Sequence, residues 1–183
     1  MKKSFLFLAD GFEEVEAIGT LDVLRRGSID VRTVSISKKK EVVGAHGVYV
    51  MADLLLDEVL GNDADFLICP GGMPGAKNLA DCTALLQWIQ EHFDKGGRVA
   101  AICAAPALVL SQIKMAEKCK MTCYPGFETY LPEADMQPQG VVVDGNVITG
   151  KGPGYAFEFG LAILEQLASK ETATDVAAGM LLD

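Results

Sequence analysis

The stretch RVAAICAAPALVL, residues 98–110, decides the fold of this 183-residue chain. It begins with a short apolar run at residues 99–102, which has the length and β-branched content of a buried parallel strand. The alanine- and leucine-rich sequence that follows prefers a helix, so the change from strand to helix is predicted at Cys103. Pro106 suits the first turn of such a helix, where an amide hydrogen has no intrahelical partner.

A cysteine at a strand-to-helix corner has the setting of a nucleophile. Such a corner is sharp, and the free amides at the start of the helix point at the side chain. Helix N-termini can lower the pKa of a thiol to roughly 3.5–7.5, so we expect a lowered pKa for Cys103. The small side chains of Ala104 and Ala105 leave the backbone open to a ligand. The alternative is that Cys103 is one more small buried hydrophobic residue, since free cysteines are often buried.

The composition favours one compact domain over residues 1–183. Half of the residues are hydrophobic, which is enough for a sizeable core. The net charge of −9 argues against a nucleic-acid-binding surface. No apolar segment reaches the ~18 residues that a membrane span requires. The first apolar run is too short for the core of a signal peptide, so we expect a cytoplasmic protein without a membrane partner.

The five cysteines do not predict a disulfide framework or a metal centre. They are odd in number and form no CxxC pair. Cys119 and Cys123 have thiols that can bind zinc, but no second pair of ligands lies near them in the sequence. We therefore predict no metal.

Strand-like and helix-like segments alternate along the chain. Predicted strands are residues 4–9, 31–36, 65–69, 99–102 and 120–124, with hairpins at 42–51 and 140–149. Predicted helices are residues 13–26, 54–60, 84–95, 155–169 and 173–181. This order indicates an α/β fold with a mostly parallel sheet and an appended β-hairpin. Ligands bind such sheets at the carboxyl ends of the strands, where residues 10–16, 70–75 and 103–106 are expected to meet.

The glycine loop after the strand at 65–69 can supply backbone amides. Gly71 and Gly72 carry no side chain that would cover these amides, and together with the amide of Ala104 they can form an oxyanion hole. The alternative is an ordinary tight turn. The loop is not a P-loop, since no GK[ST] follows it, and the chain lacks a GxGxxG sequence after its first strand.

Glu16 is the most informative acid. At helical spacing it shares a row with Phe12 and Gly19, which is apolar or small and would face inward. A buried carboxyl has a raised pKa and can donate a hydrogen bond to a neighbouring thiolate. The helix is apolar on several sides, so this pattern does not exclude Glu13 or Glu14, and a solvated Glu16 is the alternative.

A cysteine protease or amidotransferase needs a histidine beside its cysteine. The chain has two histidines. His92 lies in the charged stretch EHFDK and is expected at the surface, and His46 lies upstream in the predicted hairpin. The sequence therefore does not favour ordinary cysteine-hydrolase chemistry.

Four motifs resemble the ThiJ/PfpI superfamily, in the branch of the Parkinson-disease protein deglycase and bacterial YajL. They are ADGFEEVEA (9–17), PGGMPGAKNL (70–79), AAICAAPALV (100–109) and ITGKGPGYAFEFGLAILE (148–165), and their order and spacing match. The resemblance implies a flavodoxin-like fold, with a doubly wound, mostly parallel sheet sandwiched by helices. It also implies a homodimer.

The resemblance assigns roles to individual positions. Cys103 matches the nucleophilic, oxidation-sensitive cysteine of the family, and Glu16 matches the protonated glutamate beside it. Gly72 and Ala104 match the amide donors. The turn Gly152-Pro153-Gly154 matches one near the site and the dimer contact.

Two positions depart from the family pattern. Tyr124 stands where many members have a histidine near the cysteine, and its hydroxyl is a poor base because the reference pKa is about 10. His46 stands where relatives often have an arginine. Both are candidates for the pocket wall, and both changes argue against a protease-like role.

The resemblance implies a glyoxalase III or protein-deglycase activity on small reactive aldehydes such as methylglyoxal, without a cofactor. The alternative is a non-enzymatic oxidative-stress sensor or redox-regulated chaperone that uses the same cysteine. An intracellular peptidase or amidase is the third hypothesis, and it lacks a histidine that the sequence can place beside Cys103.

Overall fold

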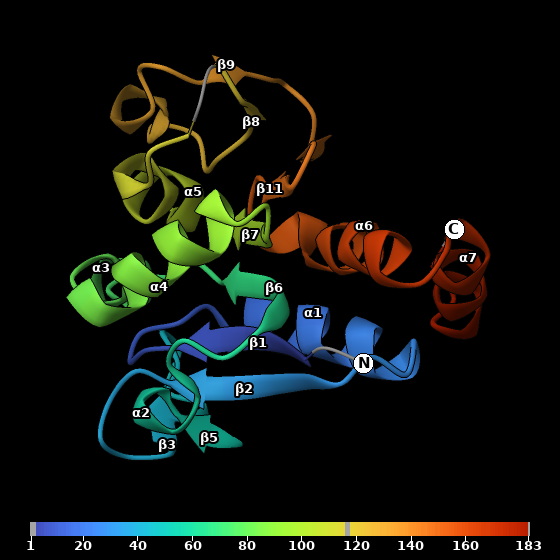
Figure 1. Cartoon of the computed structure of the whole chain (residues 1–183). Coiled ribbons are helices and arrows are strands. Elements are labelled where there is room, and N and C mark those ends of the chain that lie inside the picture. Colours follow the sequence, from blue (N-terminus) through green and yellow to red (C-terminus); the bar gives the residue numbers. More distant parts are fainter. Residues whose placement is uncertain (1–2, 116–117, 183) are drawn as a thin grey trace.

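A mostly parallel sheet forms the centre of the molecule (Figure 1). The computed structural model describes residues 3–115 and 118–182. Seven strands lie in the order β10-β11-β7-β6-β1-β2-β5. Their bounds are β1 (Lys3–Leu8), β2 (Val31–Ser35), β5 (Leu54–Leu55), β6 (Ala64–Cys69), β7 (Arg98–Ile102), β10 (Val141–Asp144) and β11 (Val147–Gly150). Neighbouring strands are parallel except for the antiparallel pair β10–β11.

The central strands β1, β6 and β7 are apolar runs that are buried almost throughout. This is the pattern of strands covered by helices on both faces. On one face, the rings of Phe5 and Phe7 lie 5.4 and 5.6 Å from the ring of Trp88. The buried strands place their carboxyl ends side by side, and that edge holds the candidate site.

Helices flank the sheet, as the predicted α/β fold requires (Figure 1). The α-helices are α1 (Glu14–Arg26), α2 (Leu56–Val59), α3 (Gly75–Ala80), α4 (Thr83–Asp94), α5 (Ala105–Leu108), α6 (Ala156–Leu167) and α7 (Lys170–Gly179). Helices α1 and α6 approach closely because Gly19 and Gly160 lack side chains: a Cβ on Gly160 would lie 3.0 Å from Val23. No helix in the described ranges is long and apolar enough to cross a membrane.

Both predicted hairpins are confirmed. Strands β3 (Glu41–Val43) and β4 (Tyr49–Met51) form an antiparallel pair apart from the main sheet. Strands β10 and β11 form the second hairpin at the edge of the main sheet. Its turn lies at Asp144-Gly145-Asn146, within the predicted hairpin at 140–149, and Gly145 has the positive φ of 58° that such a turn favours.

The predicted strand at residues 120–124 is too long. The observed strand β8 (Lys120–Met121) is short and pairs with β9 (Asp135–Met136) outside the main sheet. The next amides have other partners: Thr122 N donates to Thr149 Oγ1, and Tyr124 N donates to the carbonyl of Cys103. These long-range hydrogen bonds end the strand and bring Tyr124 to the cysteine.

Three predicted helices differ from the observed ones. The segment 54–60 begins with the edge strand β5, which pairs with β2, before the short helix α2. The helix after Cys103 is one turn long and continues as the 3-10 helix η1 (Leu110–Gln112). Helix α7 begins earlier than predicted because Ser169 Oγ caps it by accepting a hydrogen bond from Thr172 N.

Candidate active site

Cys103 occupies a strained corner between β7 and α5. Its φ of +65° lies in the left-handed region, which is unfavourable for a residue with a Cβ. Two hydrogen bonds hold it there: Cys103 N donates to Gly150 O over 2.9 Å, and Tyr124 N donates to Cys103 O over 2.8 Å. The side chain is buried with 8% of its surface exposed. The structure therefore has the sharp corner that the sequence predicts, and neighbouring chain segments fix it.

Glu16 points into the protein from the first turn of α1 and is fully buried. Its Oε2 accepts a hydrogen bond from Gly71 N over 2.8 Å. Its Oε1 is also buried and has no such partner in the described part of the chain. The carboxyl lies beside the Cys103 thiol and interacts with it. A buried oxygen without a donor is costly for a carboxylate and is a suitable place for a proton.

The surroundings raise the pKa values of both Glu16 and Cys103. Burial raises the pKa of Glu16 to about 7, the charge of Glu13 adds to the rise, and the hydrogen bonds from Gly71 and Cys103 oppose it. Burial also raises the pKa of the Cys103 thiol to about 12, and the neighbouring Glu16 carboxylate adds to that rise.

The predicted lowering of the Cys103 pKa is therefore wrong. The amides of Gly72 and Ala104 do lower it, but by less than burial and the carboxylate raise it. Helix α5 has a single turn, so its free amides contribute little of the helix dipole that the sequence argument assumed.

Cys103 can be reactive without a lowered pKa if it acts together with Glu16. With pKa values of about 7 and about 12, the two groups together give up one proton near neutral pH and hold the second over a wide range. A carboxylate that titrates near neutral pH is well matched to take a proton from the thiol as the sulfur attacks. The pair can thus act as nucleophile and general base.

The glycine loop after β6 closes over this pair. A Cβ on Gly71 would lie 2.5 Å from Cβ of Cys103 and 2.7 Å from Oε2 of Glu16, so no side chain fits there. Gly72 has a φ of +87°, which favours glycine. The amides of Gly72 and Ala104 both act on the Cys103 thiol and lower its pKa. These two donors are in place to bind an oxygen that develops negative charge next to the sulfur.

Tyr124 lies next to Cys103, and the Gly152-Pro153 turn lies next to Tyr124. Tyr124 is half-exposed, and its ring packs edge-on against Phe127 with centroids 6.3 Å apart. A Cβ on Gly152 would lie 3.3 Å from the Tyr124 ring. Pro153 begins the 3-10 helix η3 (Pro153–Tyr155). Tyr124 and Gly152 are therefore neighbours, and the main chain of Tyr124 touches Cys103.

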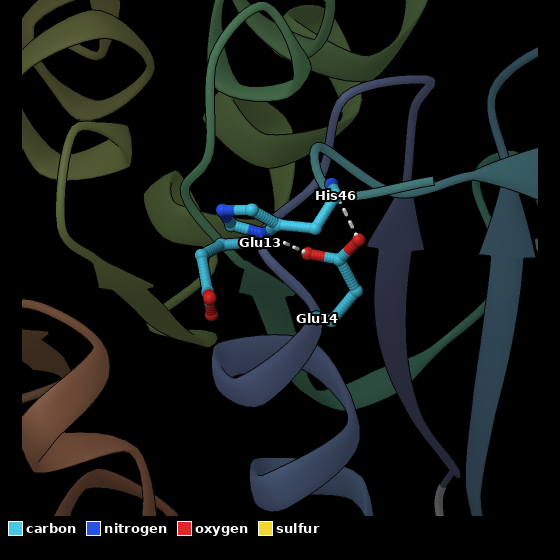
Figure 2. A group of neighbouring side chains, drawn as sticks. All are labelled: Glu13, Glu14 and His46. Atoms are coloured by element: carbon cyan, nitrogen blue, oxygen red, sulfur yellow. Dashed lines mark hydrogen bonds and ion pairs between the residues drawn. The ribbon is translucent and has the colours of Figure 1, made fainter. Parts of the chain in front are cut away.

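His46 binds a different acid from the one beside Cys103 (Figure 2). Its amide donates to Glu14 Oε1 and its Nδ1 lies 2.7 Å from Glu14 Oε2. These bonds raise the pKa of His46, whose side chain is mostly exposed. The ring of His92 lies 3.1 Å from the carbonyl of Arg98, at the opposite end of β7 from Cys103. Both histidines therefore have other partners than the thiol.

Glu13, Glu14 and His46 are the side chains whose arrangement comes nearest to a metal-binding group in the described ranges. One ligand atom of each lies within 4.8 Å of the others. However, Glu14 already uses both oxygens on His46, and Glu13 Oε2 accepts a hydrogen bond from Glu16 N over 2.7 Å. Helical spacing alone offers Glu13 only as an alternative to Glu16. The sequence signal for its separate role is its place three residues before Glu16, at which the side chain of a helix N-cap binds the backbone.

Comparison with known proteins confirms the resemblance seen in the motifs. Residues 2–166 match the model of the DJ-1/PfpI family. Protein DJ-1 homolog B of Arabidopsis thaliana is 36% identical over 99% of this chain, but the chain spans only 42% of that relative. Glutathione-independent glyoxalase DJR-1.2 of Caenorhabditis elegans is 36% identical, covering 93% of this chain and 91% of the relative. Oxidized Toxoplasma gondii DJ-1 superposes with a TM-score of 0.95 and 35% identity, covering 99% of this chain and 98% of that structure.

Substitution of Gly71 by alanine tests the packing of the pair. The added methyl group would collide with both Cys103 and Glu16, so we expect alkylation of Cys103 by iodoacetamide at pH 8 to change by about tenfold or more. Mass spectrometry of the labelled peptide measures it. In the control Gly179→Ala, the methyl group enters open space in α7 and the rate stays at the wild-type value. An unchanged rate in Gly71→Ala would contradict the described packing.

Proposed function

The chain belongs to the DJ-1/PfpI family, and we propose that it converts small reactive aldehydes such as methylglyoxal, with Cys103 as nucleophile and no added cofactor. One observation carries the proposal: the Cys103 thiol lies beside a fully buried carboxyl, whose pKa burial raises to about 7, and two backbone amides also act on the thiol. The relative named as a glutathione-independent glyoxalase supports the substrate class. The homodimer that the motifs imply stays a prediction.

The first step is addition of the thiol to the aldehyde. The Cys103 sulfur attacks the carbonyl carbon while the Glu16 carboxylate takes the thiol proton. The electrons of the C=O double bond move to the oxygen, which is bound by the amides of Gly72 and Ala104. Glu16 then returns the proton to this oxygen. The product is a hemithioacetal, and the pair is back in its starting charge state.

With methylglyoxal the same acid can complete the conversion. Glu16 removes the proton from the carbon bonded to sulfur, which gives an enediolate, and a proton is returned to the adjacent carbon. The proton of the hemithioacetal hydroxyl passes to the oxygen on that adjacent carbon, so that the first carbon becomes the carbonyl of a lactate thioester on Cys103. Attack by water releases lactate and restores the thiol. In sum, one aldehyde and one water give one hydroxy acid, and no electrons are exchanged with a cofactor. Because Glu16 both accepts and donates a proton, a pKa of about 7 suits it to this role.

Cys103→Ser and Glu16→Gln test the proposal directly. Each removes one member of the pair, and we expect methylglyoxal consumption and lactate formation to fall by about 10²-fold or more. Cys119→Ser is the matched control, because Cys119 is also a thiol beside a carboxylate, Asp144, with its pKa raised to about 12. The control should retain wild-type turnover. Full activity in Cys103→Ser would overturn the proposal.

A redox sensor is the second candidate function. It is favoured by the Toxoplasma gondii relative, which was solved in an oxidized form, and by the buried carboxyl and amides that could bind a sulfinate at Cys103. Titration with hydrogen peroxide followed by peptide mass spectrometry should show the first oxygen on Cys103, ahead of the other four thiols. Equal oxidation of all five cysteines would exclude this function.

A further inference from the structure

Glu13 is bonded to both segments that hold the Cys103–Glu16 pair. Its side-chain Oε2 accepts a hydrogen bond from Glu16 N over 2.7 Å, and its own amide donates to the carbonyl of Gly71 over 3.0 Å. Gly71 in turn donates to Oε2 of Glu16. Glu13 thus closes a small ring of contacts around the carboxyl that takes part in the chemistry.

Capping alone does not explain a glutamate at this position. Glu13 is the N-cap residue of α1. Serine, threonine, aspartate and asparagine are the preferred N-caps, since their short side chains reach the free amides with little loss of entropy. What a glutamate adds over serine or asparagine is a full negative charge beside Glu16.

Glu13 is the charged side chain that acts on the Glu16 carboxyl through its charge. The corner after β7 contributes Cys103, and the loop after β6 contributes only the uncharged amide of Gly71. On α1, Glu14 is bound by His46 through two hydrogen bonds (Figure 2). Burial is the main cause of the raised pKa of Glu16, and the Glu13 charge adds to it by opposing ionisation.

We propose that Glu13 is a positioning residue of the Cys103–Glu16 pair: its carboxylate fixes the backbone of Glu16 and places a negative charge beside the Glu16 carboxyl. The effect of Glu13 on turnover rests on the proposed function, whereas its effect on the Cys103–Glu16 pair does not. Without the charge, Glu16 would lose its proton at lower pH and would be a weaker base at neutral pH.

The experiment is an NMR titration of the Glu16 side-chain carboxyl carbon in the full chain, labelled with ¹³C-glutamate. The Glu16 signal is identified by its loss in Glu16→Gln. Glu13→Gln keeps an oxygen that can cap α1 but removes the charge, so the Glu16 midpoint should move to lower pH by roughly half a pH unit. Glu13→Asp keeps both the charge and a good cap, and should retain the wild-type midpoint.

Glu14→Gln is the matched control, because it removes an equal charge from the adjacent residue. Its Glu16 midpoint should equal that of the wild type. Glu13→Ala, which loses the cap as well, should also lower the melting temperature by about 2–4 °C, whereas Glu13→Gln should not. An unchanged midpoint in Glu13→Gln, or an equal shift in Glu14→Gln, would overturn the proposal and leave Glu13 as a helix cap only.

The titration separates this inference from the proposed function. A shifted midpoint in a protein that does not consume methylglyoxal would uphold the role of Glu13 and refute the aldehyde activity. In an active protein, the acidic limb of the kcat/KM profile should move with the Glu16 midpoint in Glu13→Gln. An acidic limb that stays in place would contradict the role of Glu13 in turnover.

Discussion

The burial of the Glu16 carboxyl against the Cys103 thiol is the constraint on which the candidate site depends. An acid without exposed surface tolerates its position only if it keeps a proton or finds donors, and here one oxygen has the amide of Gly71 while the other has no conventional donor. The neighbouring features follow from this pair. Gly71 must lack a side chain, and Cys103 must adopt a left-handed backbone that Gly150 and Tyr124 hold in place.

Much of the fold could be predicted because it follows from local patterns. The apolar runs that became β1, β6 and β7 are buried on both faces, and such runs read as parallel strands without reference to the rest of the chain. The turn at residues 144–146 likewise carries its own signal. Once three parallel strands lie side by side, their following loops must meet at one edge, so the region of the candidate site could be predicted as well.

The electrostatics of the site could not be predicted from the corner alone. Helix N-termini lower thiol pKa values as a rule, but the pKa of Cys103 depends on burial and on Glu16, which is 87 residues away in the sequence. The position of Tyr124 also depends on a contact distant in the sequence, because its hydrogen bond to Cys103 ends the strand β8 earlier than predicted. Helical spacing left Glu13, Glu14 and Glu16 open, and tertiary contacts give each a different partner.

The most direct test of the account is the pH dependence of Cys103 alkylation by iodoacetamide, in the wild type and in Glu16→Gln, followed by peptide mass spectrometry. If the two groups share protons, the wild-type rate rises with a midpoint near the pKa of Glu16, about 7. In Glu16→Gln that step disappears, and the rate rises only at alkaline pH, as a buried thiol alone requires. Superimposable profiles for the two proteins would show that Cys103 titrates independently of Glu16 and would contradict the central claim.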